Sequence, residues 1–492
     1  MKYYVKTYGC QMNYADSERI RTVFNNFGVE EVKDIKKADY IVLNSCAVRQ
    51  KAEDKLLGQG RLIKRLKQKH KSQFDSSAKE GIYPIVILTG CMVKTGIKGR
   101  VKKKSVERIR NELLHNIDWL DYAVSIEKVF SLLEQILYER GNEKKNNELR
   151  DQSKTYLDIP STPYSSFEAS LPISYGCNHH CTFCTVPFSR GEENFRSYNE
   201  IKNEYSDYVK QEYKKITLLG QTVNKWLNPK YEYHPKAYSW YKYGEILPNA
   251  LDSDGSEPDN FLNLLSDLDS VEGKYWLNFI SSYPNYFTKD LIKYIVESIK
   301  SEDGHLVPNI HLAVQSGSNR VLADMYRHYS IEEFISIVRQ FREKIPDISI
   351  TTDIIVGYTT ETEEDFQKSI ELVRNMDFDM IYISEYSVRP DTPASELGDK
   401  VSKIEKTKRK KILNSIFEKN LIKRNKQFLN STQEVLIQKR HKNKLIGRSR
   451  YGKDVMILNT KDINDFSRWY GKFIEVKITD TGAWGLKGKV KG

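Results

Sequence analysis

The sequence predicts an α/β protein built in three parts. Near the amino terminus, apolar strand-like runs alternate with helical patterns, which is typical of an open parallel sheet with right-handed crossovers. In the middle of the chain, such runs end repeatedly in polar or small residues, which suits a partial (β/α) barrel with its site at the carboxyl ends of the strands. Near the carboxyl terminus, short strand-like runs punctuated by glycines indicate a small β-barrel. We expect domains at residues 1–140, 169–428 and 429–492, with 141–168 as a linker.

The first domain brings three distant cysteines into equivalent positions. Strands are predicted at residues 3–7, 40–43 and 85–88, with helices at 16–27 and 52–70 between them. Just beyond each strand comes one cysteine of the set Cys10, Cys46 and Cys91. Because open parallel sheets bind ligands at the carboxyl edge of their strands, these thiols are expected to form one site. Backbone N–H groups at the following helix starts would favour an anionic group there. The alternative is three unrelated buried thiols.

The central domain opens with a compact cysteine motif. Cys177, Cys181 and Cys184 have the spacing C-x3-C-x2-C. A structural zinc site needs four ligands, so zinc would have to recruit His179 or His180. A [4Fe-4S] cluster held by three cysteines leaves one iron open to a small ligand. With Phe183 before the last cysteine, the motif resembles the signature of the radical SAM superfamily, in which the open iron binds S-adenosylmethionine.

The resemblance extends over nearly the whole chain, to the methylthiotransferase family within that superfamily. In the first domain, the matching segments are residues 8–13, 44–49, 52–55 and 89–92. In the central domain, they are residues 177–184, 187–192, 218–224, 311–318, 352–357 and 361–366. The segment Cys46-Ala47-Val48-Arg49, followed by Ala52-Glu53-Asp54-Lys55, favours the branch that acts on tRNA.

What the resemblance implies is a transferase with two [4Fe-4S] clusters and S-adenosylmethionine as cofactors. The expected reaction is methylthiolation of carbon 2 of N6-dimethylallyladenosine at position 37, in the anticodon stem-loop of tRNA. That carbon–hydrogen bond is not acidic, so the cofactors rather than a side-chain base carry the hard step. A radical from one S-adenosylmethionine activates the base, and another S-adenosylmethionine supplies the methyl group. An electron donor such as flavodoxin or ferredoxin and a monomeric enzyme are implied as well.

Four polar residues at predicted strand ends match family motifs and are candidates for contacts with S-adenosylmethionine: Gln221, Ser282, Gln315 and Asp353. The alternative for each is an ordinary hydrogen bond at a strand end. The chain also departs from the family pattern. Tyr358-Thr359-Thr360 replaces the usual Phe-Pro-Gly, Tyr283 replaces a His, and Phe195-Arg196-Ser197 replaces Ser-Arg-Pro. An aromatic insert at about residues 226–260 reads as a surface loop, with stacking on RNA bases as the functional alternative.

Charge is concentrated in the last fifth of the chain. The 492 residues carry a net charge of +12 with a pI of about 9.0. Residues 401–492 hold 24 basic and 8 acidic residues, a surplus of 16, so the first 400 residues sum to −4. Strands predicted at 433–440, 445–450, 453–458 and 473–479 follow a basic helical stretch at 403–428 and resemble a TRAM domain, an RNA-binding barrel. Phosphate contacts by some of these cations are expected.

The sequence also bears on where the protein is found and on which other functions are possible. The start of the chain has no signal-peptide pattern, and its apolar runs fall far short of the ~20 residues that cross a bilayer. A cytoplasmic protein with reduced thiols and no membrane partner is expected. Rival substrates are N6-threonylcarbamoyladenosine in tRNA and an aspartate of a small-subunit ribosomal protein. A zinc-bearing RNA-binding protein is the non-enzymatic alternative.

Overall fold

The computed structural model describes residues 1–47, 50–73, 84–93, 111–142, 156–228, 260–458 and 466–491. Val48, Arg49, most of the expected linker (143–155) and most of the expected insert (229–259) lie outside them. The chain divides into two compact units. Unit 1 contains Met1–Tyr164, Ser174–His180 and Cys184–Arg196, and unit 2 contains Ser165–Ile173, Cys181–Phe183 and Ser197–Gly492. The cysteine loop at 177–184 therefore contributes residues to both units.

Unit 1 holds a five-stranded sheet in which every pairing is parallel. Its strands are β1 (Lys2–Tyr8), β2 (Glu30–Glu31), β3 (Tyr40–Ser45), β4 (Ile85–Thr89) and β5 (Tyr122–Ala123), in the order β2-β1-β3-β4-β5. The three predicted strands are confirmed. The short edge strands β2 and β5 were not predicted, because two residues give no readable alternation.

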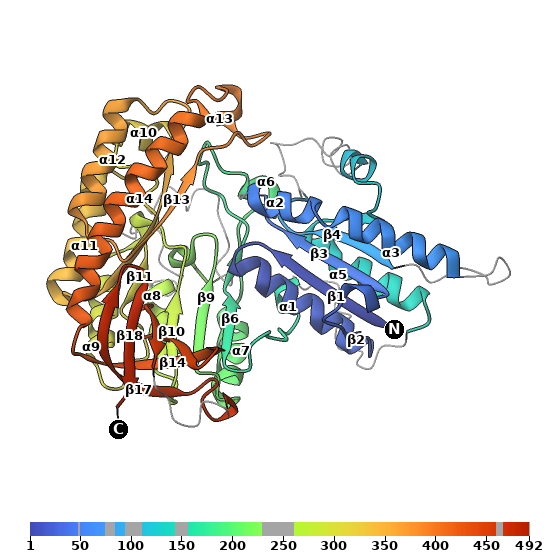
Figure 1. Cartoon of the computed structure of the whole chain (residues 1–492), viewed down its shortest axis with the longest axis horizontal. Coiled ribbons are helices and arrows are strands. Elements are labelled where there is room, and N and C mark those ends of the chain that lie inside the picture. The colour runs from blue at the N-terminus through green and yellow to red at the C-terminus, as the bar shows by residue number, and fades with distance from the viewer. Residues whose placement is uncertain are drawn as a thin grey trace, which may run out of the picture. The chain divides into compact units, whose positions relative to one another are not determined.

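Helices cover both faces of this sheet (Figure 1). They are α1 (Gln11–Asn26), α2 (Gln50–Leu57), α3 (Gly60–Gln73) and α5 (Ile126–Glu139), with 3-10 turns η1 (Ile35–Lys37) and η3 (Tyr156–Asp158). All six residues of β3 are buried, and alternate side chains enter different cores. Tyr40 and Val42 pack with α1 and α5, whereas Ile41 and Leu43 pack with α2 and α3. This two-sided burial explains why the strand is an unbroken apolar run.

Two predicted helix boundaries need correction. The helix predicted at 52–70 is two helices, because α2 ends at Leu57 and α3 begins at Gly60. A side chain at Gly60 would collide with the indole of Trp119, so this glycine marks a close packing contact. The helix predicted from residue 16 begins at Gln11, because Cys10 is its N-cap and Asn13 completes a capping box.

A small hairpin completes unit 1. Strands β7 (Ser174–Tyr175) and β8 (Asn194–Phe195) pair antiparallel, and the short helix α6 (Val186–Arg190) lies in the sequence between them. Tyr175 joins the core formed by α1 and α5, with its ring 5.2 Å from that of Tyr156. The segment that follows Cys184 is thus anchored in the unit that also holds Cys10, Cys46 and Cys91.

Unit 2 contains the predicted partial barrel. Its six strands are β6 (Glu168–Pro172), β9 (Lys215–Leu219), β10 (Trp276–Phe279), β11 (Asn309–His311), β12 (Ser349–Val356) and β13 (Met380–Glu385). They form two parallel three-stranded sheets, β6-β9-β10 and β11-β12-β13. Parallel bridges between Leu277 and Leu306 and between Ser282 and Leu312 join the two sheets into one curved array.

Helices surround this array, as Figure 1 shows. They are α7 (Tyr198–Lys210), α8 (Phe261–Asp269), α9 (Lys289–Lys300), α10 (Asn319–Asp324), α11 (Ile331–Lys344), α12 (Glu363–Asn375), α13 (Pro393–Glu396) and α14 (Lys403–Asn425), with 3-10 turns η4 (Val223–Lys225) and η7 (Pro284–Tyr286). The basic helix α14 confirms the helix predicted from residue 403. No helix in the described parts of the chain is both long and apolar enough to span a membrane.

The carboxyl-terminal strands close into a barrel of five. They are β14 (Thr432–His441), β15 (Lys444–Ser449), β16 (Asp454–Ile457), β17 (Phe473–Gly482) and β18 (Gly485–Val490), after the turn η8 (Lys426–Phe428), and η9 (Phe466–Arg468) precedes β17. The order is β14-β15-β16-β18-β17, with β16 and β18 parallel. The first four strands were predicted. A strand at β18 was not, because Gly485 and Gly488 interrupt its apolar alternation.

This barrel belongs to the same compact unit as the (β/α) strands, and buried charges join the two. The carboxylate of Asp379, which is 5% exposed, accepts hydrogen bonds from Lys453 of the barrel at 2.7 Å and from Arg424 of α14 at 3.4 Å. Arg450 of the barrel donates to the carbonyl oxygens of Gly304 and Leu306 at 2.8 and 2.9 Å. Lys453, Arg424 and Arg450 are thereby occupied inside the protein.

Candidate functional site

The sheet of unit 1 places Cys10, Cys46 and Cys91 at one edge. In the register, Tyr8 pairs with Ser45 and Asn44 pairs with Thr89, so the carboxyl ends of β1, β3 and β4 are level. One cysteine follows each of these three adjacent strands within two residues of its end. Cys46 and Cys91 are each 3% exposed, while Cys10 is exposed. The predicted alignment of the three strand ends is therefore observed.

Two buried asparagines hold the loops that carry these cysteines. The side-chain oxygen of Asn13 accepts from the backbone N–H of Cys10 at 3.2 Å and from its thiol at 3.3 Å. The amide of Asn13 donates to Asn44 at 2.9 Å and lies 4.0 Å from the sulfur of Cys91. Gly90 has a φ of +87°, and a Cβ there would overlap the side chain of Asn44. Only glycine lets the chain turn this closely before Cys91.

A buried ion pair contacts Cys91. Nε of Arg190 donates to the sulfur of Cys91 at 3.1 Å, and its Nη2 donates to Oδ2 of Asp16 at 2.6 Å. The side chains of Arg190 and Asp16 are 1% and 0% exposed. Tyr156 donates a further hydrogen bond to Asp16 at 3.3 Å. A guanidinium aimed at a thiol stabilises the thiolate, which is the form that binds a metal.

The pKa of Cys91 reflects these opposing neighbours. The hydrogen bond with the Cys46 thiol and burial raise the pKa of Cys91 well above its ordinary value, and the charge of Arg190 opposes that rise. Without iron, this site therefore holds thiols, and loading it with metal must release protons. Three thiols, a cation and a capped helix start at one sheet edge fit an iron–sulfur cluster.

The loop at residues 177–184 begins on a constrained glycine in unit 1. Gly176 has a φ of +71°, and a Cβ there would overlap the carbonyl of Glu192. The backbone N–H of Cys177 bonds to the carbonyl of Gly191 at 3.3 Å. The sulfur of Cys184 accepts from the backbone N–H of Val186 at 3.4 Å. Backbone donors to sulfur are the usual support of cluster thiolates.

Cys181 lies in unit 2, and an arginine side chain contacts its sulfur. Nη1 of Arg327 donates to the sulfur of Cys181 at 3.3 Å. The guanidinium lies over the ring of Tyr283, 4.3 Å from its centroid, and its Nε donates to the hydroxyl of Tyr329 at 3.1 Å. Tyr283 is the residue that replaces the family's usual His, so this departure supports the cation that contacts Cys181.

Thr182, the residue after Cys181, is held by the segment in which Tyr358-Thr359-Thr360 replaces the family's Phe-Pro-Gly. Thr182 shares a hydrogen bond with the hydroxyl of Tyr358 at 2.8 Å, and both hydroxyls bond to the carbonyl of Asp324, at 2.8 and 3.1 Å. Tyr358 is fully buried in an apolar cluster that Phe183 also contacts. Thr359 and Thr360 bond to Gly398 and Asp324. The Tyr-Thr-Thr turn thus replaces Phe-Pro-Gly with hydrogen bonds.

Each cysteine set offers three thiols, which are the ligands that iron–sulfur clusters take. Among the described residues, no group of three or more His, Cys, Asp or Glu side chains is arranged to hold one metal ion. The two candidates for a fourth zinc ligand differ in exposure, since His179 is half-buried and His180 is exposed.

The four candidate S-adenosylmethionine residues lie in, or just after, four consecutive strands of the array. Gln221 follows β9, Ser282 follows β10, Gln315 follows β11 and Asp353 lies within β12. The buried hydroxyl of Ser282 has no hydrogen-bond partner among the described residues. Gln315 has a φ of +71°, a conformation that costs a non-glycine residue about 1–3 kcal/mol and is common at ligand sites.

Asp353 is already engaged by a neighbouring strand. Its Oδ2 lies 3.0 Å from Nε2 of His311, whose Nδ1 accepts from the backbone N–H of Ser281 at 3.3 Å. Nε2 must therefore carry the proton that Asp353 accepts. The contact of Asp353 with S-adenosylmethionine stays a prediction, and this hydrogen bond fixes the orientation of its carboxylate.

The barrel presents a basic hairpin between β14 and β15. Lys439, Arg440, Lys442 and Lys444 are all exposed on it. Other cations of the basic region are structural. Lys406 and Arg409 of α14 are 2% and 5% exposed, and the Nη1 of Arg409 lies 2.6 Å from Oε2 of Glu361. The surplus of 16 charges is therefore only partly available to a polyanion.

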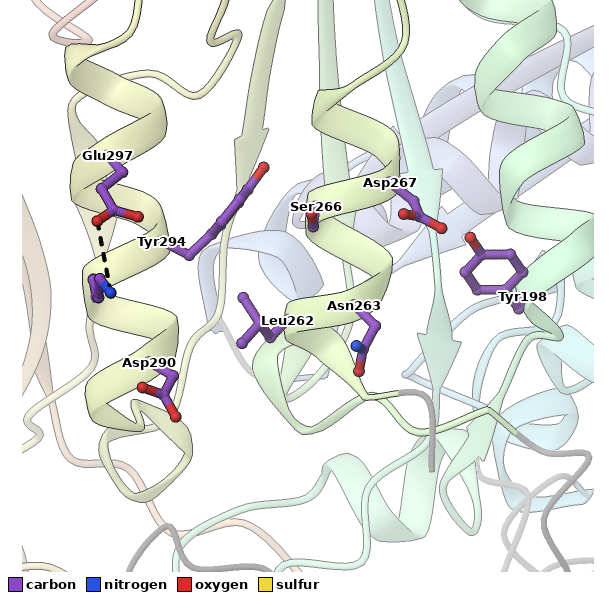
Figure 2. Close-up of a pocket in the computed structure, with 9 residues that line it drawn as sticks. Tyr198, Leu262, Asn263, Ser266, Asp267, Asp290, Tyr294 and Glu297 are labelled. Carbon is purple, nitrogen blue, oxygen red and sulfur yellow. Dashed lines mark ion pairs between the residues drawn. The ribbon is translucent and has the colours of Figure 1, made fainter. Parts of the chain in front are cut away.

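A polar hollow of about 490 Å³ opens elsewhere in unit 2 (Figure 2). It is lined by residues of α8 and α9 and by Tyr198 at the start of α7. Asp267, Asp290 and Glu297 face it, with Lys293 close to Glu297. These residues belong to the helix layer and not to the strand ends, so the hollow is not part of the predicted site.

Comparison with known proteins shows the superfamily and the family to which this chain belongs. Residues 171–373 match the radical SAM superfamily, and residues 2–109 match the uncharacterized protein family UPF0004. The protein is thus a radical SAM enzyme, with the [4Fe-4S] cluster and S-adenosylmethionine of that class, preceded by an additional domain. A protein of Natranaerobius thermophilus, named tRNA-2-methylthio-N(6)-dimethylallyladenosine synthase, is 33% identical over 99% of this chain and 96% of its own.

A protein of the same name from Clostridium tetani is also 33% identical, with the same coverage. The chain belongs to this family of radical SAM methylthiotransferases. A solved radical SAM methyltransferase, TsrM of Kitasatospora setae, is similar with a TM-score of 0.47 and 12% identity, covering 80% of this chain and 76% of that one.

Sequence reasoning missed Arg190 and Arg327, which donate to cysteine sulfurs, and Asp16, which holds Arg190. Arg190 lies in one of the segments that match the family, so membership of that segment was an available signal. Asp16 and Arg327 gave no such signal, because their contacts with Arg190 and Cys181 arise only in the tertiary fold.

Proposed function

We propose that this protein transfers a methylthio group to carbon 2 of N6-dimethylallyladenosine at position 37 of tRNA. Membership of the family over almost the full chain is the observation that carries the proposal. The two cysteine sets give it a chemical basis. Cys10, Cys46 and Cys91 would hold one [4Fe-4S] cluster, and Cys177, Cys181 and Cys184 the other.

When bound, the clusters supply what the adenine ring lacks: an electron for splitting S-adenosylmethionine and sulfur for the new bond. Overall, the C2–H bond is replaced by C2–S, the hydrogen passes to a 5′-deoxyadenosyl group, and a second S-adenosylmethionine provides the methyl group. An electron donor such as flavodoxin or ferredoxin is required for the splitting. The side chains hold and shield these groups. Arg190 and Arg327 each donate to one thiolate, and Ser282 offers an unpartnered hydroxyl to S-adenosylmethionine.

The basic hairpin at Lys439 to Lys444 supports a tRNA substrate. Exposed lysines and arginines contact phosphates and position the nucleic acid without reading its sequence. A base in the single-stranded anticodon loop can then be splayed into the site. A cytoplasmic, monomeric enzyme fits this proposal. Removing the barrel would be a poor test, because Asp379 would lose its partner Lys453.

Nucleoside mass spectrometry of tRNA from cells with and without the protein tests the substrate. Loss of 2-methylthio-N6-dimethylallyladenosine, restored by the intact chain, is expected. Loss of the methylthio form of N6-threonylcarbamoyladenosine instead would move the activity to that substrate. Unchanged tRNA with an unmethylthiolated ribosomal aspartate would move it to the protein substrate.

Two cysteine variants separate the roles of the two sets. Cys181→Ala should abolish formation of 5′-deoxyadenosine, because the open iron is lost. Cys46→Ala should keep that activity in the absence of tRNA and yet yield no methylthiolated product. If Cys46→Ala still methylthiolated tRNA, the first set would not supply the sulfur.

A further inference from the structure

We infer that Arg190, held by Asp16, is a positioning residue that fixes Cys91 and links the two cysteine sets through α6. The inference rests on the proposed function for the identity of the two clusters. Arg190 lies six residues after Cys184 in the sequence, and both residues belong to unit 1. One short segment therefore has a radical SAM cysteine at its start and a contact with Cys91 at its end.

The geometry of α6 limits how far apart the two ends can be. Val186–Arg190 is helical, and its first residues are tied to Cys184 by the hydrogen bond from the Val186 N–H to the cysteine sulfur at 3.4 Å. A helical rise of about 1.5 Å per residue places residues 186 and 190 about 6 Å apart along the axis. The turn of the chain after Arg190 is fixed by Gly191, whose N–H bonds to Pro187 at 3.0 Å.

The charges show why an arginine is needed at the far end. Arg190 and Asp16 are both inaccessible, so neither charge could remain buried alone at low cost. Asp16 orients the guanidinium with two contacts, at 2.6 and 3.4 Å, which leaves Nε pointing at Cys91. The pair is neutral overall. It therefore supplies a directed donor to the thiolate without placing net charge at the site.

A donor to a cluster thiolate withdraws electron density from the iron, and hydrogen bonds to sulfur raise the reduction potential of iron–sulfur clusters. Losing the donor should favour the oxidised cluster. We expect at least a tenfold shift of the reduction equilibrium, which corresponds to a fall of 59 mV for one electron.

The test uses the full chain in which Cys177, Cys181 and Cys184 are replaced by Ala, so that only the first cluster contributes. In this background, Arg190→Met with Asp16→Asn removes the donor while keeping the site neutral and keeping an acceptor for Tyr156. Arg190→Lys keeps the charge without the planar fork. The control is Arg21→Gln with Glu31→Gln, an ion pair between α1 and β2 with an N–O distance of 2.7 Å.

Iron content, potentiometric titration and electron paramagnetic resonance are the readouts. The Arg190→Met/Asp16→Asn variant should show the tenfold shift or lose iron, while its thermal unfolding matches that of the background. Arg190→Lys should recover part of the shift. The control variant should keep the potential and iron content of the background. Wild-type iron content with an unchanged potential in both Arg190 variants would overturn the inference. If tRNA analysis refuted the substrate while the potential shifted, only the proposed function would fall.

Discussion

Replacing Tyr358 with Phe should loosen the segment that carries Cys181. The aromatic ring is fully buried, and Phe fills the same space, so packing in the apolar cluster is retained. The change removes only the hydroxyl, which bonds to Thr182 at 2.8 Å and to the carbonyl of Asp324 at 3.1 Å. Phe is also the residue that the family usually has here, so the variant should fold.

The magnitude follows from the number of hydroxyl protons. The hydroxyls of Thr182 and Tyr358 carry one proton each, so they make two hydrogen bonds at a time among themselves and the carbonyl of Asp324. Thr182 can still donate to Asp324 at 2.8 Å in the variant, so the net loss is one buried hydrogen bond, worth about 1 kcal/mol. An increase of about 1 kcal/mol raises the population of the opened segment about fivefold.

Iron release to a chelator from the anaerobic, cluster-loaded protein measures that population, provided that opening is fast relative to capture. The expected rate for Tyr358→Phe is about five times that of the unaltered chain. Tyr386→Phe is the matched control, since Tyr386 lies in the same cluster and its hydroxyl donates at 3.3 Å to Ala394 rather than to the loop. Equal rates for the two variants would refute the argument that Tyr358 restrains the cysteine segment.

Three further predictions concern other parts of the chain. Burial raises the pKa of Asp365, but hydrogen bonds from Arg320, Ser318 and Thr362 more than offset this and hold the pKa well below its usual value. Its contribution to stability is thus fully present above the unfolded pKa of about 4 and is lost progressively as pH falls from there through the folded pKa. Asp365→Asn should lower the free energy of unfolding at pH 7 by about 1–3 kcal/mol and by less at pH 3, as urea unfolding of the iron-free chain would reveal; an equal loss at both pH values would count against it. Arg327→Met should reduce 5′-deoxyadenosine formation while tRNA affinity in filter binding stays unchanged, and a fall in both would indicate general disruption. Lys442→Gln with Lys444→Gln should weaken tRNA binding and flatten its salt dependence by about 0.7–0.9 in log–log slope per lost phosphate contact, whereas an unchanged slope would exclude this hairpin from the interface.

The sequence was sufficient where a residue's role depends on its own segment. Strand-end positions of Cys10, Cys46 and Cys91 follow from local alternation, because a parallel sheet brings its carboxyl ends to one edge. The closed barrel was likewise indicated by short strands with glycines between them. Such features need no knowledge of which distant residue packs against which.

Contacts between distant segments could not be predicted in this way. Arg190 and Asp16 are separated by 174 positions, and nothing near either residue indicates that they pair. In α14, the buried Lys406 and Arg409 resemble the exposed cations beside them in the sequence. Their burial depends on ion pairs with Asp399 and Glu361, which lie on other segments.

The buried carboxylate of Asp379 bears on how such enzymes exchange parts during evolution and in the laboratory. A carboxyl-terminal barrel transplanted from a relative without a lysine equivalent to Lys453 would remove the nearest cation of Asp379 and leave Arg424 at 3.4 Å and Arg342 at 3.8 Å. Losing one partner of a buried carboxylate costs about 1–3 kcal/mol. Chimeras joined between α14 and β14 should therefore be more stable when residues 379 and 453 are inherited together, which makes this pair a practical guide for choosing crossover points.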